Sequence, residues 1–231
     1  MSGRVGSITT DIISDGLVFN IDAANRASTI PSTSTTTTFN TVNTNISGAF
    51  SGNAQYDSST ISPSYDFDGV DDVISTNTSF SNLSVSTAFS VSIWYNITTA
   101  TLYDFVIGAP TDGGAWNTGF GFFINGTNAL RFWVDGWNDS NQYIQSSNLN
   151  TSQWYNAIGT LSTTTGLKLY INADISGTAT GTAIDGLTNQ IFIGNSYKSI
   201  VGNTYYSILG NIGSIQIYNR ALSANEVLHN Y

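Results

Sequence analysis

The chain has 231 residues and a formal net charge of −9, from 15 acidic and six basic side chains, and it lacks cysteine. This charge balance argues against nucleic acid and anionic membrane surfaces as partners, because both are bound through basic patches. Without cysteine, the chain forms no disulfide, zinc–thiolate site or thiol nucleophile. Hydrophobic residues make up 40% and charged residues 9%, so Ser, Thr and Asn cover the surface, a composition typical of β proteins.

The predicted organisation is an N-terminal arm, residues 1–15, followed by one domain, residues 16–231. The arm lacks the apolar core of a signal peptide, since Asp11 and Asp15 interrupt it. No apolar run approaches the length of a membrane span. Residues 27–62 are a polar tract with isolated apolar residues, which predicts a long loop pinned onto the domain.

Alternating apolar residues predict the strands, beginning with Gly16–Asp22. The clearest strand is Phe89–Ile97, in which every second side chain is apolar. Further strands are expected at Tyr103–Gly108, Gly119–Ile124, Ala129–Val134, Trp154–Leu161, Gly166–Ile171, Ile191–Gly194 and Gly210–Tyr218. Trp94, Trp133 and Trp154 lie within strands and are interpreted as core or sheet-face residues.

The stretch Ser64–Ser75 predicts a strand, an acidic turn at Asp68-Gly69 and a second strand. Two interpretations of its aspartates remain open: they hold a hard cation such as Ca²⁺, or they only form the turn. The EF-hand pattern fails, because Val70 stands where an oxygen ligand belongs. The candidate metal ligands are Asp68, Asp71 and Asp72.

The end of the chain predicts a short helix. Ser223 and Glu226 have the spacing of a capping box, and Leu222 with Val227 forms a hydrophobic staple around it. Many short strands with one terminal helix indicate an all-β fold, a two-sheet antiparallel sandwich with a short C-terminal helix.

Three segments carry a family resemblance: GLVFNIDAAN at residues 16–25, FDGVDDVI at 67–74 and IYNRALSANEV at 217–227. They resemble laminin-G-like domains of the concanavalin A-like lectin/glucanase superfamily. The resemblance implies a jelly roll of two antiparallel sheets. It also implies placement in secreted adhesins or in bacteriophage surface proteins, and it supports a structural Ca²⁺ as a possible cofactor.

Glycoside hydrolysis uses two carboxylates, and the retaining glucanases that the chain resembles carry two glutamates on one strand. Here Glu226 is the sole glutamate and already fits a helix cap, while the lone His229 lies near the end of the same helix. We therefore expect a protein that is not an enzyme.

Two loops combine aromatic rings with amides and carboxylates, the groups that bind sugars. They span residues 112–117 and 135–143. The candidate carbohydrate ligands are Trp116, Trp137 and Tyr143 as stacking platforms, with Asp112, Asn117, Asn138 and Asp139 as polar partners. The alternative interpretation is that these aromatic residues only pack and the Asp-Gly pairs only turn the chain.

Two functional hypotheses follow. The first is a structural and interaction module on a particle surface, a bacteriophage capsid decoration or fibre protein, whose arm buries Ile8, Ile12 and Ile13 against a neighbouring subunit of an oligomer. The second is a carbohydrate-binding lectin or adhesin domain of a secreted microbial protein, with surface glycans as its partners. The corresponding locations are the virion surface and the extracellular space.

Overall fold

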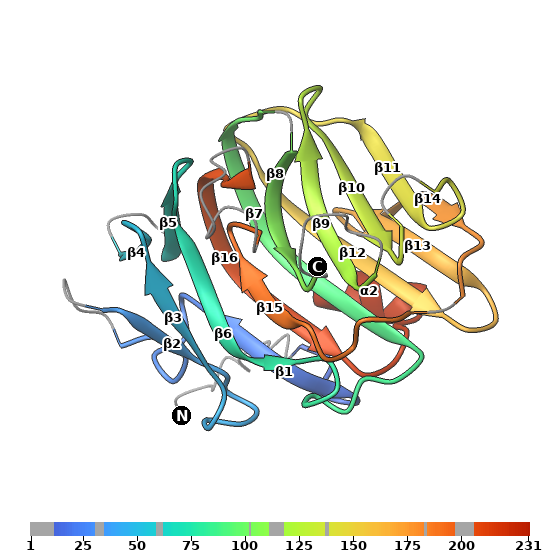
Figure 1. Ribbon diagram of the computed structural model, residues 1–231, viewed down its shortest axis with the longest axis horizontal. Helices are drawn as coiled ribbons and strands as arrows, with labels where there is room; N and C mark the ends of the chain where they lie inside the picture. The colour runs from blue at the N-terminus through green and yellow to red at the C-terminus, as the bar shows by residue number, and fades with distance from the viewer. Residues whose placement is uncertain are drawn as a thin grey trace, which may run out of the picture.

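The computed structural model describes residues 12–30, 35–58, 62–101, 103–110, 118–136, 139–182, 184–196 and 206–231. These residues form two antiparallel sheets of eight strands each, which stack face to face with a short helix outside them (Figure 1). The predicted all-β sandwich with a C-terminal helix is confirmed.

The first sheet, sheet A, has the order β14-β13-β12-β7-β16-β5-β4, with β1 also pairing to β16. Its strands are β1 (Leu17–Asp22), β4 (Gln55–Asp57), β5 (Ser64–Asp68), β7 (Phe89–Thr99), β12 (Trp154–Ser162), β13 (Gly166–Ile171), β14 (Asp174–Ala179) and β16 (Leu209–Tyr218). The long strands β7 and β16 lie side by side at its centre.

The second sheet, sheet B, has the order β11-β10-β9-β8-β15-β6-β3-β2. Its strands are β2 (Thr37–Phe39), β3 (Ser47–Ser51), β6 (Val73–Ser79), β8 (Tyr103–Gly108), β9 (Phe120–Asn125), β10 (Ala129–Val134), β11 (Tyr143–Asn148) and β15 (Gln190–Ile193). A tight turn that begins at Asn125-Gly126 joins β9 to β10, with Leu130 opposite Ile124.

The core lies between the sheets and is rich in phenylalanine. The Phe80 and Phe120 rings stack with centroids 4.2 Å apart, and Phe89 meets Phe80 edge-on at 4.8 Å. In β7 the inward side chains, such as Val91 and Ile93, are fully buried, whereas Trp94 points to the outer face. Period-two alternation thus divides the side chains of one strand between the core and the outer face of sheet A, as predicted.

The acidic turn carries the chain from one sheet to the other. β5 belongs to sheet A and β6 to sheet B, so the two strands do not form a hairpin. Gly69 has φ +78° at the bend, a conformation that side-chain-bearing residues rarely adopt. The turn therefore lies at the rim of the sandwich.

The polar tract at residues 27–62 is more ordered than the sequence predicts. Its described residues include β2, β3 and β4, which extend both sheets. The Thr38 and Thr29 hydroxyls lie 2.8 and 2.7 Å from the buried Tyr65 hydroxyl, and burial raises the pKa of Tyr65 to about 12. The tract predicted as a long loop pinned onto the domain thus also contributes three short strands, because threonine hydroxyls find partners inside the fold and suit β structure.

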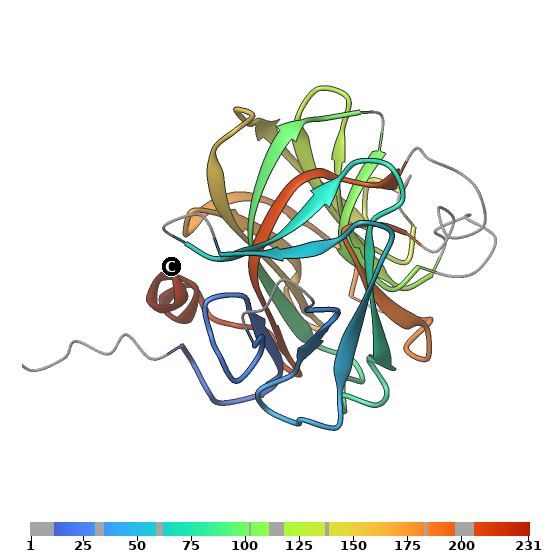
Figure 2. The same ribbon diagram turned by 90° about the vertical axis from the view of Figure 1, so that its left-hand side faces the viewer.

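Helix α2 (Ala224–Asn230) packs on the outer face of sheet A (Figure 2). Its predicted capping box is present, and Leu222 and Val227 are buried beside Tyr218. Ile13 packs against the same cluster, and its N–H donates to Asn230 Oδ1 at 2.8 Å. Ile13 thus has contacts within the chain, its expected role in a subunit contact stays a prediction, and residues 1–11 lie outside the described part. In the described residues, no helix has the length and apolarity to cross a membrane.

Candidate functional site

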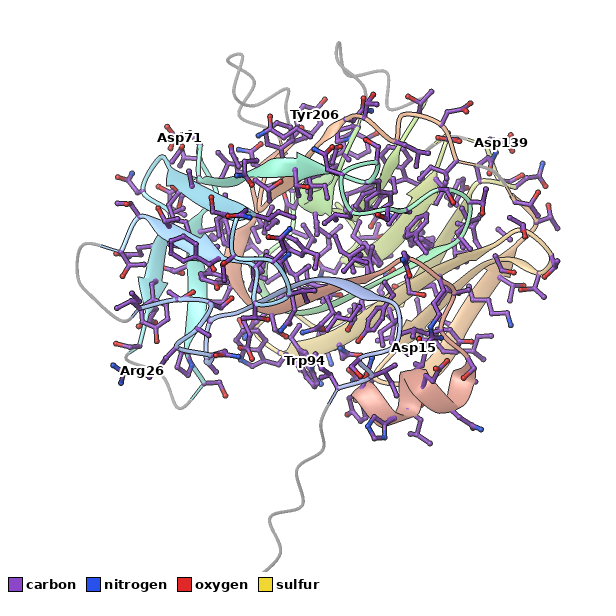
Figure 3. All side chains as sticks on the ribbon, turned by 90° about the horizontal axis from the view of Figure 1, so that it is seen from below. Asp15, Arg26, Asp71, Trp94, Asp139 and Tyr206 are labelled. Atoms are coloured by element: carbon purple, nitrogen blue, oxygen red, sulfur yellow. The ribbon has the colours of Figure 1, made fainter. Side chains whose placement is uncertain are left out.

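A pocket of about 380 Å³ opens on the outer face of sheet A, close to α2. Two partly buried tryptophans, Trp94 and Trp154, form its aromatic walls. The other lining residues are Asp22, Ala24, Ser62, Pro63, Gly213 and Ser214. We call this cavity the tryptophan pocket. Figure 3 labels Trp94 on the side of the molecule that carries α2, with Tyr206 on the opposite side.

Strand register brings the two tryptophans together. In the β7–β12 ladder Trp94 pairs with Asn156 and Trp154 pairs with Asn96, so the indoles are diagonal neighbours on one face. Gly213 lies at a β-bulge of β16 beside them. A Cβ at this glycine would lie 3.4 Å from Trp154 and 3.6 Å from Trp94. The missing side chain therefore leaves the space between the two rings open.

Among the described lining residues, Asp22 supplies the only charged group. It ends β1 opposite Ser214, and its Oδ1 accepts a hydrogen bond from the Ala24 N–H at 2.8 Å. Burial raises the pKa of Asp22, while this hydrogen bond opposes the rise. Its Oδ2 takes no hydrogen bond from the described residues, so the carboxylate retains an oxygen for a ligand hydroxyl.

The segment that follows α2 extends the aromatic wall. The Tyr231 ring stacks on Trp94 with a centroid distance of 5.7 Å and an interplanar angle of 10°. Tyr231 is 54% exposed, so its ring borders the pocket rather than belonging to the core. Two strands and the residue that follows α2 thus bring three aromatic rings together on the outer face of sheet A.

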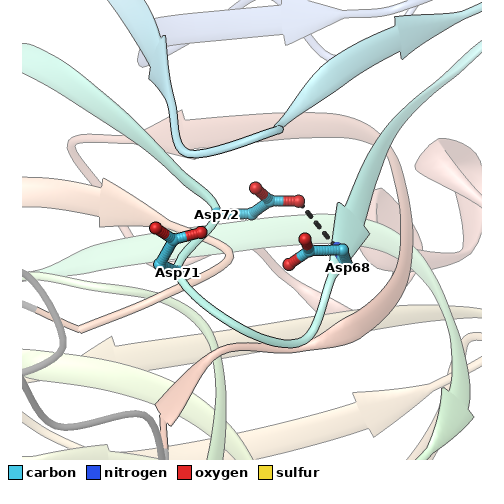
Figure 4. A group of neighbouring side chains, drawn as sticks. All are labelled: Asp68, Asp71 and Asp72. Carbon is cyan, nitrogen blue, oxygen red and sulfur yellow. Dashed lines mark hydrogen bonds between the residues drawn. The ribbon is translucent and has the colours of Figure 1, made fainter.

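The acidic turn forms a second cluster of functional groups. Each of Asp68, Asp71 and Asp72 offers one carboxylate oxygen, and these oxygens lie within 4.8 Å of one another (Figure 4). Asp72 is buried and accepts hydrogen bonds from the N–H groups of Asp68, at 2.7 Å, and Asn53. Burial raises the pKa of Asp72; the neighbouring carboxylates add to the rise and its hydrogen bonds oppose it.

Gly52 reveals an oxygen-lined cradle in this turn. A Cβ at Gly52 would lie 2.6 Å from Asp72 Oδ1 and 2.9 Å from both the carbonyl oxygen and Oδ1 of Asp71. Carboxylate and carbonyl oxygens that converge in this way are the donors a hard cation such as Ca²⁺ takes. The donor set therefore fits the Ca²⁺ that the family resemblance implies.

A second aromatic group lies on the outer face of sheet B. Phe105, Phe123 and Trp133 are all 0% exposed and pack together. Tyr143 lies beside them, with the Arg131 guanidinium carbon 3.9 Å from its ring centroid. Because Phe105, Phe123 and Trp133 are fully buried, none of them presents an exposed ring face to a ligand.

The comparisons with known proteins agree with this geometry. The model of the laminin-G-type family described as the concanavalin A-like lectin/glucanases superfamily matches residues 68–228, from the acidic turn to α2. The chain belongs to this superfamily. A search of curated protein sequences gave no match.

Solved structures place the superfamily fold over nearly the whole chain. Domain 4 of AbnA, an extracellular arabinanase from Geobacillus stearothermophilus solved with arabinotriose, has 17% identity and a TM-score of 0.67, over 92% of this chain and 96% of that one. Trypanosoma rangeli sialidase in complex with the inhibitor DANA has 14% identity and a TM-score of 0.65. This match covers 94% of the present chain but only 33% of the sialidase. At these identities the likeness concerns the fold.

Most of the predicted carbohydrate ligands of this lectin-like domain lie outside the described residues: Asp112, Trp116, Asn117, Trp137 and Asn138. Asp139 is described; its Oδ1 accepts from the Asn141 N–H at 2.9 Å in a turn. Tyr143 begins β11 and carries Arg131 on its ring, as above. The rim-loop site stays a prediction.

The sequence prediction missed the tryptophan pocket. It placed Trp94 and Trp154 correctly on a sheet face but gave them no function, and it did not single out Asp22. The sequence did show a tryptophan at an outward position in each of two strands. That pattern alone does not distinguish a tryptophan that lines a binding pocket from one that is buried by its neighbours. Glu226, by contrast, is held as predicted in the helix cap, where its carboxylate accepts from Arg220 Nη2 at 2.6 Å and Nη1 at 3.0 Å.

Proposed function

We propose that the protein is a non-catalytic carbohydrate-binding module that holds a saccharide in the tryptophan pocket. The observation that carries this proposal is the open space between Trp94 and Trp154 beside the Asp22 carboxylate. Indole rings stack on the C–H faces of a sugar ring, and carboxylates accept hydrogen bonds from its hydroxyls. A cavity of about 380 Å³ lies in the usual range for small-molecule sites.

The comparisons favour this function over the virion hypothesis. The AbnA domain, whose fold the chain shares, was solved with a trisaccharide and belongs to an extracellular enzyme. Extracellular placement and surface glycans as partners are part of our proposal for this chain. A role as a capsid decoration or fibre protein receives no support from the family or the solved structures, and we do not rest the proposal on it.

Tryptophan fluorescence titration with a panel of oligosaccharides tests the proposal. We expect a saturable change for at least one member. Trp154→Ala should weaken binding by about fivefold or more, because the lost stacking is of order 1–3 kcal/mol. Gly213→Val should also abolish it by filling the pocket without removing a ring. Ile175→Ala, which removes an exposed apolar side chain from β14, is the matched control and should bind normally.

The rim loops provide the alternative location. Trp116→Ala and Trp137→Ala are expected to leave binding in the tryptophan pocket unchanged. If these variants lose the saccharide while Trp154→Ala retains it, the binding function stands but its site belongs to the predicted rim loops. If no saccharide on a broad panel binds the wild-type chain, the proposed function is wrong.

We further propose that the acidic turn holds a structural Ca²⁺ through Asp68, Asp71 and Asp72. The cation would neutralise crowded carboxylates and tie the residue 52–53 turn to the strand β5, whose other end borders the pocket. Added Ca²⁺ should raise the melting temperature of chelator-treated protein, because a ligand that binds only the folded state stabilises it. Asp71→Asn should abolish the rise, whereas Asp174→Asn, an exposed site on β14, should keep it. An equal melting temperature with EGTA and with Ca²⁺ would show that the acidic turn does not bind Ca²⁺.

A further inference from the structure

The described lining of the tryptophan pocket is acidic. Its eight described residues include one carboxylate and no Lys, Arg or His. The Asp22 carboxylate is fixed in place by the Ala24 N–H on one oxygen and by burial of the residue. A ligand that stacks on the tryptophans therefore meets a negative charge in a partly desolvated site.

No described basic side chain lines the pocket, and Arg26, in the exposed turn two residues after Ala24, is not among the lining residues. Arg220 is paired with Glu226 at 2.6 Å and with Asp15 at 2.8 Å, so its charge is already neutralised. Lys168 pairs with Thr160 in the β12–β13 ladder, six strand positions from Trp154, which corresponds to about 20 Å. His229 of α2 does not line the pocket.

The charge of the whole chain acts in the same direction. A net charge of −9 gives a negative potential that lowers the local concentration of anions around the protein. A sugar carboxylate or sulfate would enter against this field and then lie close to Asp22. Two like charges a few ångströms apart in a partly buried site repel each other strongly enough to weaken binding of the anion by more than about tenfold.

We infer that the tryptophan pocket binds uncharged saccharides, and that Asp22 is the residue that excludes saccharides bearing a carboxylate or sulfate. The inference rests on the proposed function and adds its ligand class. The same carboxylate performs both tasks, because it accepts hydrogen bonds from neutral hydroxyls and repels anions. This distinguishes the pocket from any site that recognises sialic or uronic acids through arginine.

Paired ligands test the inference directly. The probes are oligosaccharides in neutral and acidic versions: galactose against galacturonic acid oligomers, glucose against glucuronic acid oligomers, and lactose against sialyllactose. We expect the wild-type chain to bind at least one neutral member, and its acidic partner at least about tenfold more weakly. Fluorescence titration and calorimetry at pH 7 measure the ratio.

Asp22→Asn identifies the residue responsible. An asparagine retains the oxygen that accepts from Ala24, so the fold should persist, and circular dichroism with thermal melting checks this. The neutral-to-acidic ratio should fall to about threefold or less in this variant, whereas Asp174→Asn removes the same charge at a distance and should leave the ratio intact.

The possible outcomes distinguish a failure of this inference from a failure of the proposed binding function. Acidic ligands that bind the wild-type chain as tightly as neutral ones overturn the inference but keep the binding function. An unchanged ratio in Asp22→Asn overturns the assignment to Asp22. The absence of any binding, neutral or acidic, overturns the proposed function and the inference together.

Discussion

The outer faces of the two sheets carry the same residue types in two different roles: the tryptophan on sheet B is packed, and the tryptophans on sheet A border a pocket. On sheet B, Trp133 is 0% exposed between Phe105 and Phe123, and Arg131 lies over neighbouring rings. On sheet A, Trp94 and Trp154 stay partly exposed around the vacant position of Gly213. The comparison teaches that a tryptophan on an outward strand position becomes a binding wall only where its neighbours leave space.

Replacing Trp133 should give the largest effect. Trp133→Ala removes a fully buried indole, and we expect the free energy of unfolding to fall by about 3–5 kcal/mol. Trp154→Ala should cost about 1 kcal/mol or less, since its ring is partly exposed and its loss affects binding instead. Urea denaturation of both variants measures the difference; equal losses would break the comparison.

A methyl group added at Gly121 or at Gly213 tests the same comparison between the two outer faces. A Cβ at Gly121 would lie 2.6 Å from Trp133 Nε1 and 3.1 Å from Phe105, so Gly121→Ala should destabilise the fold by about 1–3 kcal/mol. Gly213→Ala meets only ordinary contacts beginning at 3.4 Å, and should be neutral or add up to about 1 kcal/mol. A chemical denaturation series compares them, and intolerance at Gly213 would show that the pocket floor is already filled.

The cation over the sheet B rings makes a smaller contribution. Arg131→Met keeps the apolar stem but loses the guanidinium above Tyr143 and its 2.8 Å hydrogen bond to Gln145, a loss of about 1 kcal/mol. Arg26→Met, at an exposed turn position, serves as the matched control and should change stability little. If both variants lose the same amount, general charge rather than the stacked contact is responsible.

The smallest effect concerns the helix that covers part of sheet A. Hydrogen bonds from Arg220 and Ser223 lower the pKa of Glu226 to about 2, below its usual 4.5. A lowered folded-state pKa adds stability that is complete above pH 4.5 and is lost as the pH falls through about 2. Glu226→Gln should therefore cost about 1 kcal/mol or less at pH 7, because solvent screens the pair.

Denaturation of the wild type and of Glu226→Gln across this pH range measures the cap. The difference in unfolding free energy should shrink as the pH falls below 4.5. A difference that stays constant with pH would show that the ionised pair does not stabilise α2. Asp174→Asn, remote from the cap, provides the reference titration.

Local patterns predicted the fold well. The alternation of β7, the glycine at the acidic turn and the capping box of α2 are each decided by neighbouring residues, and each is confirmed. The strands β3 and β14 were missed, because SGAFS and DISGTA lack strong alternation and pair through register with distant strands. Their structure comes from tertiary partners and not from local propensity.

The site was harder to predict, for a related reason. Trp94 and Trp133 occupy similar alternating strands, and the sequence does not state which outer face will be covered. Asp22 reaches the pocket only because β1 pairs with β16, which places it opposite Ser214. The residues of the tryptophan pocket come together only in the completed sheet, so the sequence did not predict the pocket. The acidic turn is formed by adjacent residues, and the sequence did predict it.

The pairing of β1 with β16 also governs how the molecule assembles. The earliest described strand finds its ladder partner only when the last one has been made, and Ile13 contacts a residue 217 positions away. During synthesis β7 has β12 on one side but an open edge on the other until residues 209–218 leave the ribosome. Completion is therefore late and slow, as expected for a fold dominated by distant contacts. Until then the unfinished sheet exposes an unpaired strand edge, the kind of surface through which folding intermediates aggregate.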